Sequence, residues 1–275
     1  MKNIMTPEPG AENFVLHKKN NEISESFRYA SYIQQAIFPS DALINRIAPE
    51  NFIFYQPRDV VSGDFYYITR KNDLLIAGVG DCTGHGVPGA LMSILGITFL
   101  NEIIMHGSFS SAGSVLNQMR EHVMEALRQT GEDNERKDGI DLALCIIDLK
   151  TKVLNFAGAF NPVYILRNNN LVEISGDMMP VGVGAEEELC FTSHLYDLQQ
   201  GDVIYLFTDG FADQFGGPGN RKFKYKPFRE LLAANSHLPM QEQKSIIERT
   251  FFEWKGNFHQ LDDVLVFGFR FNTEY

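Results

Sequence analysis

Four aspartates stand beside strand-like runs of the sequence, and their shared placement predicts a metal centre. They are Asp64 after Val60–Gly63, Asp81 after Leu74–Val79, Asp209 after Val203–Phe207, and Asp262 just before Val264–Arg270. One such aspartate is usually a turn or capping residue, but four favour convergence at one point. Ligation by oxygen alone suits Mg²⁺ or Mn²⁺ better than Zn²⁺ or Cu²⁺. Two ions about 4 Å apart could hold both the attacking and the leaving oxygen of a phosphoryl transfer.

A glycine-rich turn follows the second aspartate and offers an alternative function. The segment Gly84–Gly89 (GHGVPG) matches the G-x-G-x-x-G fingerprint of nucleotide-dependent enzymes. The charge of Asp81 would repel a pyrophosphate, however, and the chain that follows lacks the alternating strands and helices of a dinucleotide fold. The sequence contains no Gly-Lys P-loop, no cysteine with an arginine six residues later and no Asp-x-Asp motif. Water is therefore the expected nucleophile of any phosphoryl chemistry.

Composition narrows the class of protein. The 275 residues are 44% hydrophobic and 21% charged, which is typical of a globular protein. The formal net charge of −11 argues against a nucleic-acid-binding surface. Cys82, Cys145 and Cys190 form neither a disulfide framework nor a zinc motif, which indicates a reducing compartment. Because we recognise no signal peptide and no apolar run of transmembrane length, we expect a cytoplasmic protein without membrane insertion.

The elements that must position the aspartates follow from periodicity. We expect a flexible arm over residues 1–20, a helical linker over 21–45 and one large domain over 46–275. Predicted strands are Phe52–Gln56, Phe65–Thr69, Leu74–Val79, Asp141–Asp148, Val153–Ala157, Val163–Arg167, Leu171–Ile174, Leu189–His194, Val203–Phe207 and Val264–Arg270. Predicted helices are Glu22–Phe38, Ala90–Met105, Ser114–Gln129, Phe228–Ala234 and Met240–Trp254, with a charged loop at Thr130–Asp138. Short connections between strands favour antiparallel sheets covered by helices, an α+β fold.

The first predicted helix has two interpretations. Ile23, Ala30 and Ile37 are one heptad apart, but Gln34 interrupts the pattern. Two imperfect heptads are fewer than a coiled coil requires. The helix either packs on its own domain or associates with a second copy of the chain. Pro39 ends it, because proline disfavours helical backbone in the residue before it.

Four ordered motifs carry a resemblance to a known family. They are Ser62-Gly63-Asp64-Phe65, Gly80-Asp81-Cys82-Thr83-Gly84-His85-Gly86, Phe207-Thr208-Asp209-Gly210 and Leu261-Asp262-Asp263-Val264. They resemble the motifs of the PPM family of metal-dependent serine/threonine protein phosphatases, in the bacterial SpoIIE branch (RsbU-like) related to protein phosphatase 2C. The match runs from about Pro49 to Phe271, and Ile33–Pro39 resembles the helical linker that precedes this domain in many relatives.

The resemblance implies a fold, a site and a reaction. The fold is a four-layer α/β/β/α sandwich of two antiparallel sheets flanked by helices, so that residues 46–275 would form a PPM-type phosphatase domain. Two Mg²⁺ or Mn²⁺ ions would share Asp81, with the backbone carbonyl of Cys82 as a further ligand. Asp64 would complete one ion, and Asp209 and Asp262 the other. A metal-activated water would then hydrolyse phosphoserine or phosphothreonine.

The resemblance also implies partners. The substrate would be a phosphorylated regulatory protein, an anti-anti-sigma factor of the STAS type in a partner-switching system. A homodimer could form through the N-terminal helix. The alternative in another class is a catalytically weak regulatory scaffold that uses the same fold to bind a signalling partner.

Several residues near the motifs have open roles. The Cys82 side chain is expected to be packed rather than reactive. His85 could act as a general acid, or it could hold the turn or support a ligand. Asp263 is expected to support a ligand or cap a strand.

Two further groups of charged residues are assigned to the surface. The acids Asp138, Asp141 and Asp213 could hold a weaker third ion, but surface positions are favoured. The bases Lys222, Lys224 and Lys226 could meet a phosphoprotein, but a solvated loop is favoured.

Overall fold

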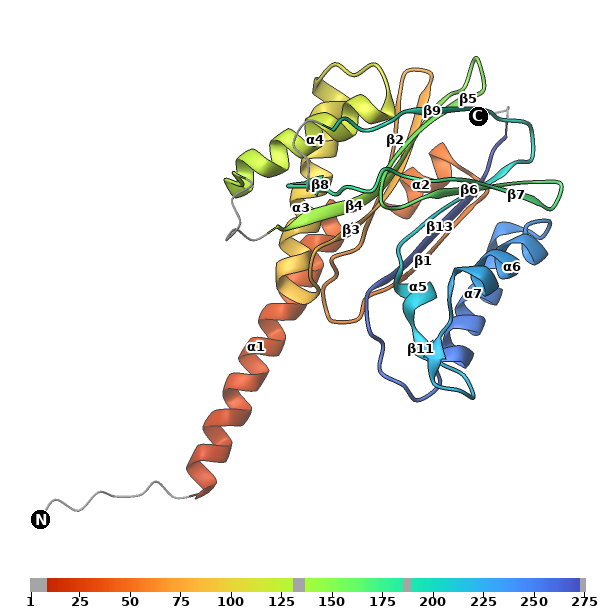
Figure 1. The fold of residues 1–275 in the computed structure, drawn as a ribbon. Helices are drawn as coiled ribbons and strands as arrows, with labels where there is room; N and C mark the ends of the chain where they lie inside the picture. The colour runs from red at the N-terminus through yellow and green to blue at the C-terminus, as the bar shows by residue number, and fades with distance from the viewer. Residues whose placement is uncertain (1–8, 131–136, 185–188, 273–275) are drawn as a thin grey trace, which may run out of the picture.

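Two antiparallel β-sheets form the middle of the computed structural model, which describes residues 9–130, 137–184 and 189–272 (Figure 1). The first sheet has the order β1 (Asn51–Gln56), β13 (Val264–Arg270), β10 (Val203–Phe207), β6 (Val163–Arg167) and β7 (Asn170–Ile174). The second has the order β2 (Phe65–Lys71), β3 (Leu74–Cys82), β4 (Gly139–Asp148), β5 (Val153–Ala159) and β9 (His194–Asp197), with β8 (Val181–Gly182) paired to β4. A separate ribbon joins β11 (Phe215–Gly216) and β12 (Arg221–Lys222).

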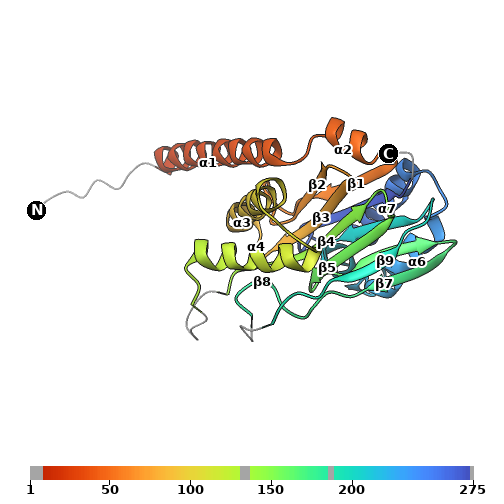
Figure 2. The same cartoon turned by 90° about the horizontal axis from the view of Figure 1, so that it is seen from above.

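Helices cover the outer face of each sheet (Figure 2). The second sheet is covered by α3 (Gly86–Asn101), its π-helical extension η1 (Glu102–His106) and α4 (Ala112–Leu127). The first is covered by α6 (Tyr225–Asn235) and α7 (Met240–Lys255), and the short α5 (Gly210–Asp213) follows β10. The chain enters the sandwich through α1 (Pro9–Ile37) and α2 (Asp41–Ile47). The four-layer α/β/β/α sandwich expected from the sequence is confirmed.

Successive side chains of a strand point to opposite faces of the sheet, and this alternation produces the layers. On β4, Leu142 and Leu144 pack toward α3 and α4, whereas Ala143 and Cys145 pack between the two sheets. A strand that is apolar on both faces must be covered on both faces. Each fully buried Leu or Val side chain stabilises the fold by roughly 1.5–3 kcal/mol relative to exposure. The two sheets therefore form a rigid base for the loops at their ends.

The N-terminal segment differs from the expectation. The first helix begins at Pro9, so the part of the expected arm after residue 8 is helical, and residues 1–8 lie outside the described part. Figure 1 shows α1 projecting away from the sandwich. A second helix, α2, buries Ile44 and Ile47 in the core between the sheets. The expected boundary at residue 46 therefore falls inside an element that packs with the domain.

The strand predicted over Leu189–His194 is wrong, and the observed strand β9 is His194–Asp197. Side chains take the hydrogen bonds that a strand would have made. The amide of Phe191 donates to Asn117 Oδ1 at 3.0 Å, and the amide of Thr192 donates to Asp177 Oδ2 at 2.7 Å. Most of the charged loop predicted over 130–138 lies outside the described residues.

One helix in the described part, Gly86–His106, is long and apolar enough to cross a membrane. Half of its most apolar window is buried inside the domain. Leu100 and Ile104 are fully buried in the core beneath α4. The core helix of a globular domain passes the same test, so this is weak evidence for a membrane span.

Candidate active site

Asp81 and Asp141 lie opposite each other where β3 and β4 pair. The sequence analysis placed Asp81 correctly at a strand end, but the favoured surface position of Asp141 is wrong, because its side chain is only partly exposed and faces the same cavities as Asp81. Burial, followed by the charge of Asp209, raises the pKa of Asp141 to about 7. Burial and the charges of Asp209 and Asp262 also raise the pKa of Asp81.

Asp64 lies behind this pair. It immediately precedes β2, and residues 60–63 form no strand, so the expected strand before it is wrong. Its side chain is 1% exposed, and its Oδ2 accepts a hydrogen bond from Thr208 Oγ1 at 2.7 Å. Burial, followed by the charge of Asp81, raises the pKa of Asp64 well above its usual range. The hydrogen bond joins the first aspartate motif to the residue that precedes Asp209.

Asp209 carries an unusual oxygen. It follows β10 and precedes α5, and its Oδ1 is buried without a hydrogen-bond partner among the residues that the structure describes. Burial, followed by the charge of Asp262, raises the pKa of Asp209 to about 6. A buried acceptor without a donor costs free energy, so this oxygen is suited to a ligand that supplies positive charge.

Asp262 and Asp263 are adjacent in the sequence but differ in environment: the first is exposed, and the second is buried and accepts backbone hydrogen bonds. Asp262 is exposed at the rim, and its Oδ1 accepts from the amide of Asp263 at 2.9 Å. Asp263 is 2% exposed, and its two oxygens accept from the amides of Arg58 and Gly63 at 2.7 and 2.8 Å. Asp263 therefore holds the loop before Asp64, the supporting role expected for it.

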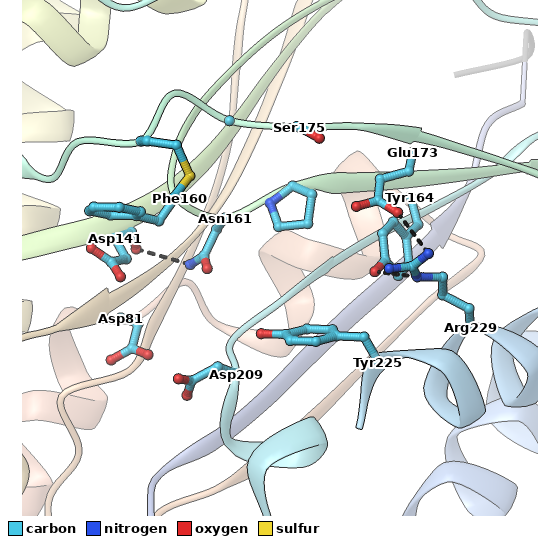
Figure 3. Close-up of a pocket in the computed structure, with 13 residues that line it drawn as sticks. Asp81, Asp141, Phe160, Asn161, Tyr164, Glu173, Ser175, Asp209, Tyr225 and Arg229 are labelled. Atoms are coloured by element: carbon cyan, nitrogen blue, oxygen red, sulfur yellow. Dashed lines mark hydrogen bonds and ion pairs between the residues drawn. The ribbon is translucent and has the colours of Figure 1, made fainter. Parts of the chain in front are cut away.

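Two cavities meet at Asp81 and Asp141 (Figure 3). The larger, of about 370 Å³, extends past Asp209 and Tyr225 to Arg229 on α6. The smaller, of about 180 Å³, is lined by the 82–85 turn and Asp262. Asp64 lines neither cavity, so the structure brings three of the four predicted aspartates to the open site and places the fourth beneath it.

Close backbone contacts hold the glycine-rich turn. A Cβ atom added to Gly89 would lie 2.1 Å from the carbonyl oxygen of Gly84 and 2.9 Å from the Cα of Gly63. A Cβ added to Gly63 would lie 3.2 Å from the carbonyl oxygen of Cys82, the predicted backbone ligand. The Cys82 side chain is buried, and burial raises the pKa of its thiol, so it is packed rather than reactive, as expected.

We expect Gly89→Ala to lower the free energy of unfolding by about 1–3 kcal/mol, because the added methyl group must displace backbone rather than a flexible side chain. Urea unfolding checks this value. Gly219→Ala is the matched control, since the nearest atom to its added Cβ is Cδ of the Arg221 side chain at 3.9 Å. Equal stability of the two variants would contradict the tight packing of α3 on the turn.

Comparison with known proteins decides the family. The family model of Stage II sporulation protein E (SpoIIE) matches residues 71–272. The chain belongs to the SpoIIE family. This assignment agrees with the four motifs and supports protein phosphatase activity.

Solved structures share the SpoIIE-family fold. The SiaA-PP2C domain of Pseudomonas aeruginosa is 32% identical, with a TM-score of 0.83 over 92% of this chain and 99% of that chain. The RsbU and RsbW domains of Rv1364c from Mycobacterium tuberculosis are 21% identical, with a TM-score of 0.62 over 81% of this chain and 60% of that chain. RsbX in complex with magnesium is 13% identical, with a TM-score of 0.53 over 80% and 94% of the two chains. No curated protein matches the sequence significantly.

The observed fold argues against the nucleotide-dependent enzyme that the glycine-rich turn suggested. Between the named strands of the described chain, every pairing is antiparallel, so the turn at Gly84–Gly89 does not belong to a parallel βαβ unit. Its glycines instead allow α3 to approach the loop at Gly63.

The carboxylates of this SpoIIE-family site fit divalent cations by their chemistry. Within the described ranges, no group of three or more His, Cys, Asp or Glu side chains meets the geometry of a preformed metal site. The pKa values of Asp64, Asp81, Asp141 and Asp209 are nevertheless all raised by burial and by neighbouring carboxylates. Bound cations would offset the repulsion between these carboxylates, and the unpartnered Oδ1 of Asp209 could coordinate one of them. The metal ligands remain predictions.

The remaining polar candidates lie at the rim. His85 is exposed, and its Nδ1 lies 3.0 Å from Asp59 Oδ2, which orients the ring at the edge of the smaller cavity. Lys222 pairs with Asp213 at 2.6 Å, and both side chains are exposed. The surface interpretation holds for this pair. Asp138 is partly buried and lines neither cavity.

Proposed function

We propose that this chain hydrolyses phosphoserine or phosphothreonine on a regulatory protein with the help of divalent cations. The observation that carries the proposal is the group of carboxylates at one end of the sandwich, with raised pKa values and an unpartnered Asp209 oxygen. Membership of the SpoIIE family supports the phosphatase activity. The carboxylate cluster supports the need for metal.

We assign the cations to the aspartates by motif position. Asp81 would contact two Mg²⁺ or Mn²⁺ ions together with the Cys82 carbonyl, Asp64 would complete one ion, and Asp209 and Asp262 the other. When bound, such ions lower the pKa of a water molecule and offset negative charge on a phosphoryl group. The structure of RsbX in complex with magnesium is consistent with the use of a divalent cation.

The residues around the aspartates hold them in place. Thr208 fixes the Asp64 carboxylate, and Asp263 fixes the backbone of Gly63. Pairing of β3 with β4 fixes the backbone of Asp81. Because rigid strands and buried hydrogen bonds orient these groups, little reorganisation is needed when a substrate arrives.

We propose a STAS-type anti-anti-sigma protein as the substrate and a homodimer through α1. The side chains of Ile23, Phe27 and Ile33 are exposed on this helix. Gln34 is instead buried, and its Nε2 donates to the carbonyl of Ser62 at 2.6 Å, so it faces the chain's own domain.

If α1 forms the dimer, Phe27→Glu should yield monomers in analytical ultracentrifugation; an unchanged mass would count against it. The cytoplasmic location stays a prediction.

Manganese-dependent hydrolysis of an aryl phosphate and of a phosphorylated STAS protein tests the function. We expect turnover with Mn²⁺ and none in excess EDTA. Two-site Mn²⁺ binding without turnover of either substrate would favour the scaffold alternative. No Mn²⁺ binding by the folded protein would rule out the metal mechanism.

A further inference from the structure

Tyr225 presents an unused hydrogen-bond donor to the larger cavity. It is the first residue of α6, and its phenol points along the cavity toward Asp209 and Asp81 (Figure 3). Its hydroxyl makes no hydrogen bond with any residue that the structure describes. Its ring packs beside Phe207, with 6.4 Å between the ring centroids. The ring is therefore held by the core while its polar end faces the site.

The backbone before Tyr225 is strained. Lys224 has a φ of 76°, in the left-handed region that residues other than glycine rarely adopt. Its amide donates to the carbonyl of Ala212 at 2.6 Å, which ties the start of α6 to the helix after Asp209. Such a conformation costs about 1 kcal/mol or more and persists where the surrounding structure imposes it. The backbone conformation at Lys224 therefore sets the position of the Cα atom of Tyr225 and the direction in which its side chain leaves the backbone.

Two other side-chain donors along the cavity already have partners. The Asn161 amide donates to the carbonyl of Asp141 at 3.2 Å. At the far end, Arg229 pairs with Glu173 at 3.2 Å and donates to Tyr164 Oη at 3.0 Å. A phosphate group that reached the aspartates would meet carboxylates on several sides. It would need donors as well as cations.

We propose that the hydroxyl of Tyr225 donates a hydrogen bond to a phosphoryl oxygen of the substrate. This inference rests on the proposed phosphatase function and names a residue that would contact the reacting group. A phenol is neutral at physiological pH, and burial raises the pKa of Tyr225 further, so the donor stays protonated. A neutral donor can bind the anion without repelling the cations beside it.

Tyr225→Phe tests the contact, because it removes one oxygen and keeps the ring. We expect kcat/KM for an aryl phosphate with Mn²⁺ to fall about 10- to 100-fold, as for the loss of a hydrogen bond to a charged group. The dissociation constant of inorganic phosphate from the Mn²⁺-loaded protein should rise by a similar factor. Mn²⁺ affinity and Tm should match those of the wild type.

Tyr205→Phe is the matched control. Its hydroxyl donates to Gln243 Oε1 at 2.5 Å within the core under α7, away from the cavity. This variant should lower Tm and leave phosphate binding unchanged. Unchanged phosphate binding in Tyr225→Phe would overturn the inference, as would a loss explained by weaker Mn²⁺ binding or a lower Tm.

The two proposals can fail separately. If the wild type binds phosphate but hydrolyses no ester, the phosphatase proposal fails, and weaker phosphate binding by Tyr225→Phe still supports the contact. If the wild type hydrolyses the ester and Tyr225→Phe does so equally well, the contact alone fails. If the Mn²⁺-loaded wild type neither hydrolyses the ester nor binds phosphate, both fail.

Discussion

Asp81→Asn should abolish phosphate hydrolysis and leave the sandwich folded. Asp81 lines both cavities and lies opposite Asp141, so it occupies the junction of the site. Asparagine keeps the shape and one acceptor oxygen but removes the negative charge with which Asp81 would hold both cations. Charge stabilisation by metal contributes several kcal/mol to such reactions. We therefore expect a loss of at least roughly 1,000-fold in kcat.

Turnover of an aryl phosphate, calorimetric titration with Mn²⁺ and circular dichroism on the same samples check this result. Asp209→Asn should behave similarly, because the unpartnered oxygen belongs to that residue. Asp73→Asn is the matched control: it makes the same change at a carboxylate that pairs with Lys150 at 2.6 Å, at the opposite end of β3 from Asp81, and should retain activity. Hydrolysis near the wild-type rate in Asp81→Asn or Asp209→Asn, with the fold intact, would rule out the assigned metal centre.

Local patterns in the sequence predicted most of the layers and part of the site. Asp81 and Asp209 could be placed because each follows an apolar run that is long enough to form a strand. Asp141 could not, because its position depends on the register between β3 and β4, which are separated by two helices and a loop. A pairing of this kind is a long-range contact that no local periodicity encodes. The signal that existed was an aspartate at the start of a predicted strand.

The misplaced strand and the overlooked tyrosine have a similar cause. Apolar residues around Phe191 resemble a strand, but Asn117 and Asp177 supply its hydrogen-bonding partners from distant elements. Tyr225 follows a basic segment that reads as a solvated loop, and its orientation depends on the strained backbone at Lys224. Tertiary contacts override local propensity at these positions. The irregular backbone at Phe191 and the orientation of Tyr225 both depend on contacts between residues that lie far apart in the sequence.

The metal-free protein should become less stable as pH rises from about 5 to 8. The pKa values of Asp141 and Asp209 are raised to about 7 and about 6, whereas an unfolded aspartate titrates near 3.9. Between these values the folded protein binds more protons than the unfolded chain, so the free energy of unfolding falls with increasing pH. The stabilisation present near pH 4 to 5 is lost as pH passes through the folded pKa values. After allowance for solvent screening, we expect a loss on the order of 2 kcal/mol.

Manganese should reverse this slope. Cations bind deprotonated carboxylates, so their affinity increases with pH, and binding at 100 times the dissociation constant adds about 2.7 kcal/mol to stability. Tm measured at pH 5, 6, 7 and 8 should therefore fall in EDTA and rise in Mn²⁺. Asp209→Asn should flatten both curves, while Asp73→Asn, which changes a carboxylate paired with Lys150 away from the site, should leave them unchanged. A Tm that does not fall with pH in EDTA would contradict the carboxylate repulsion, since that repulsion is the physical reason for expecting cations in this site.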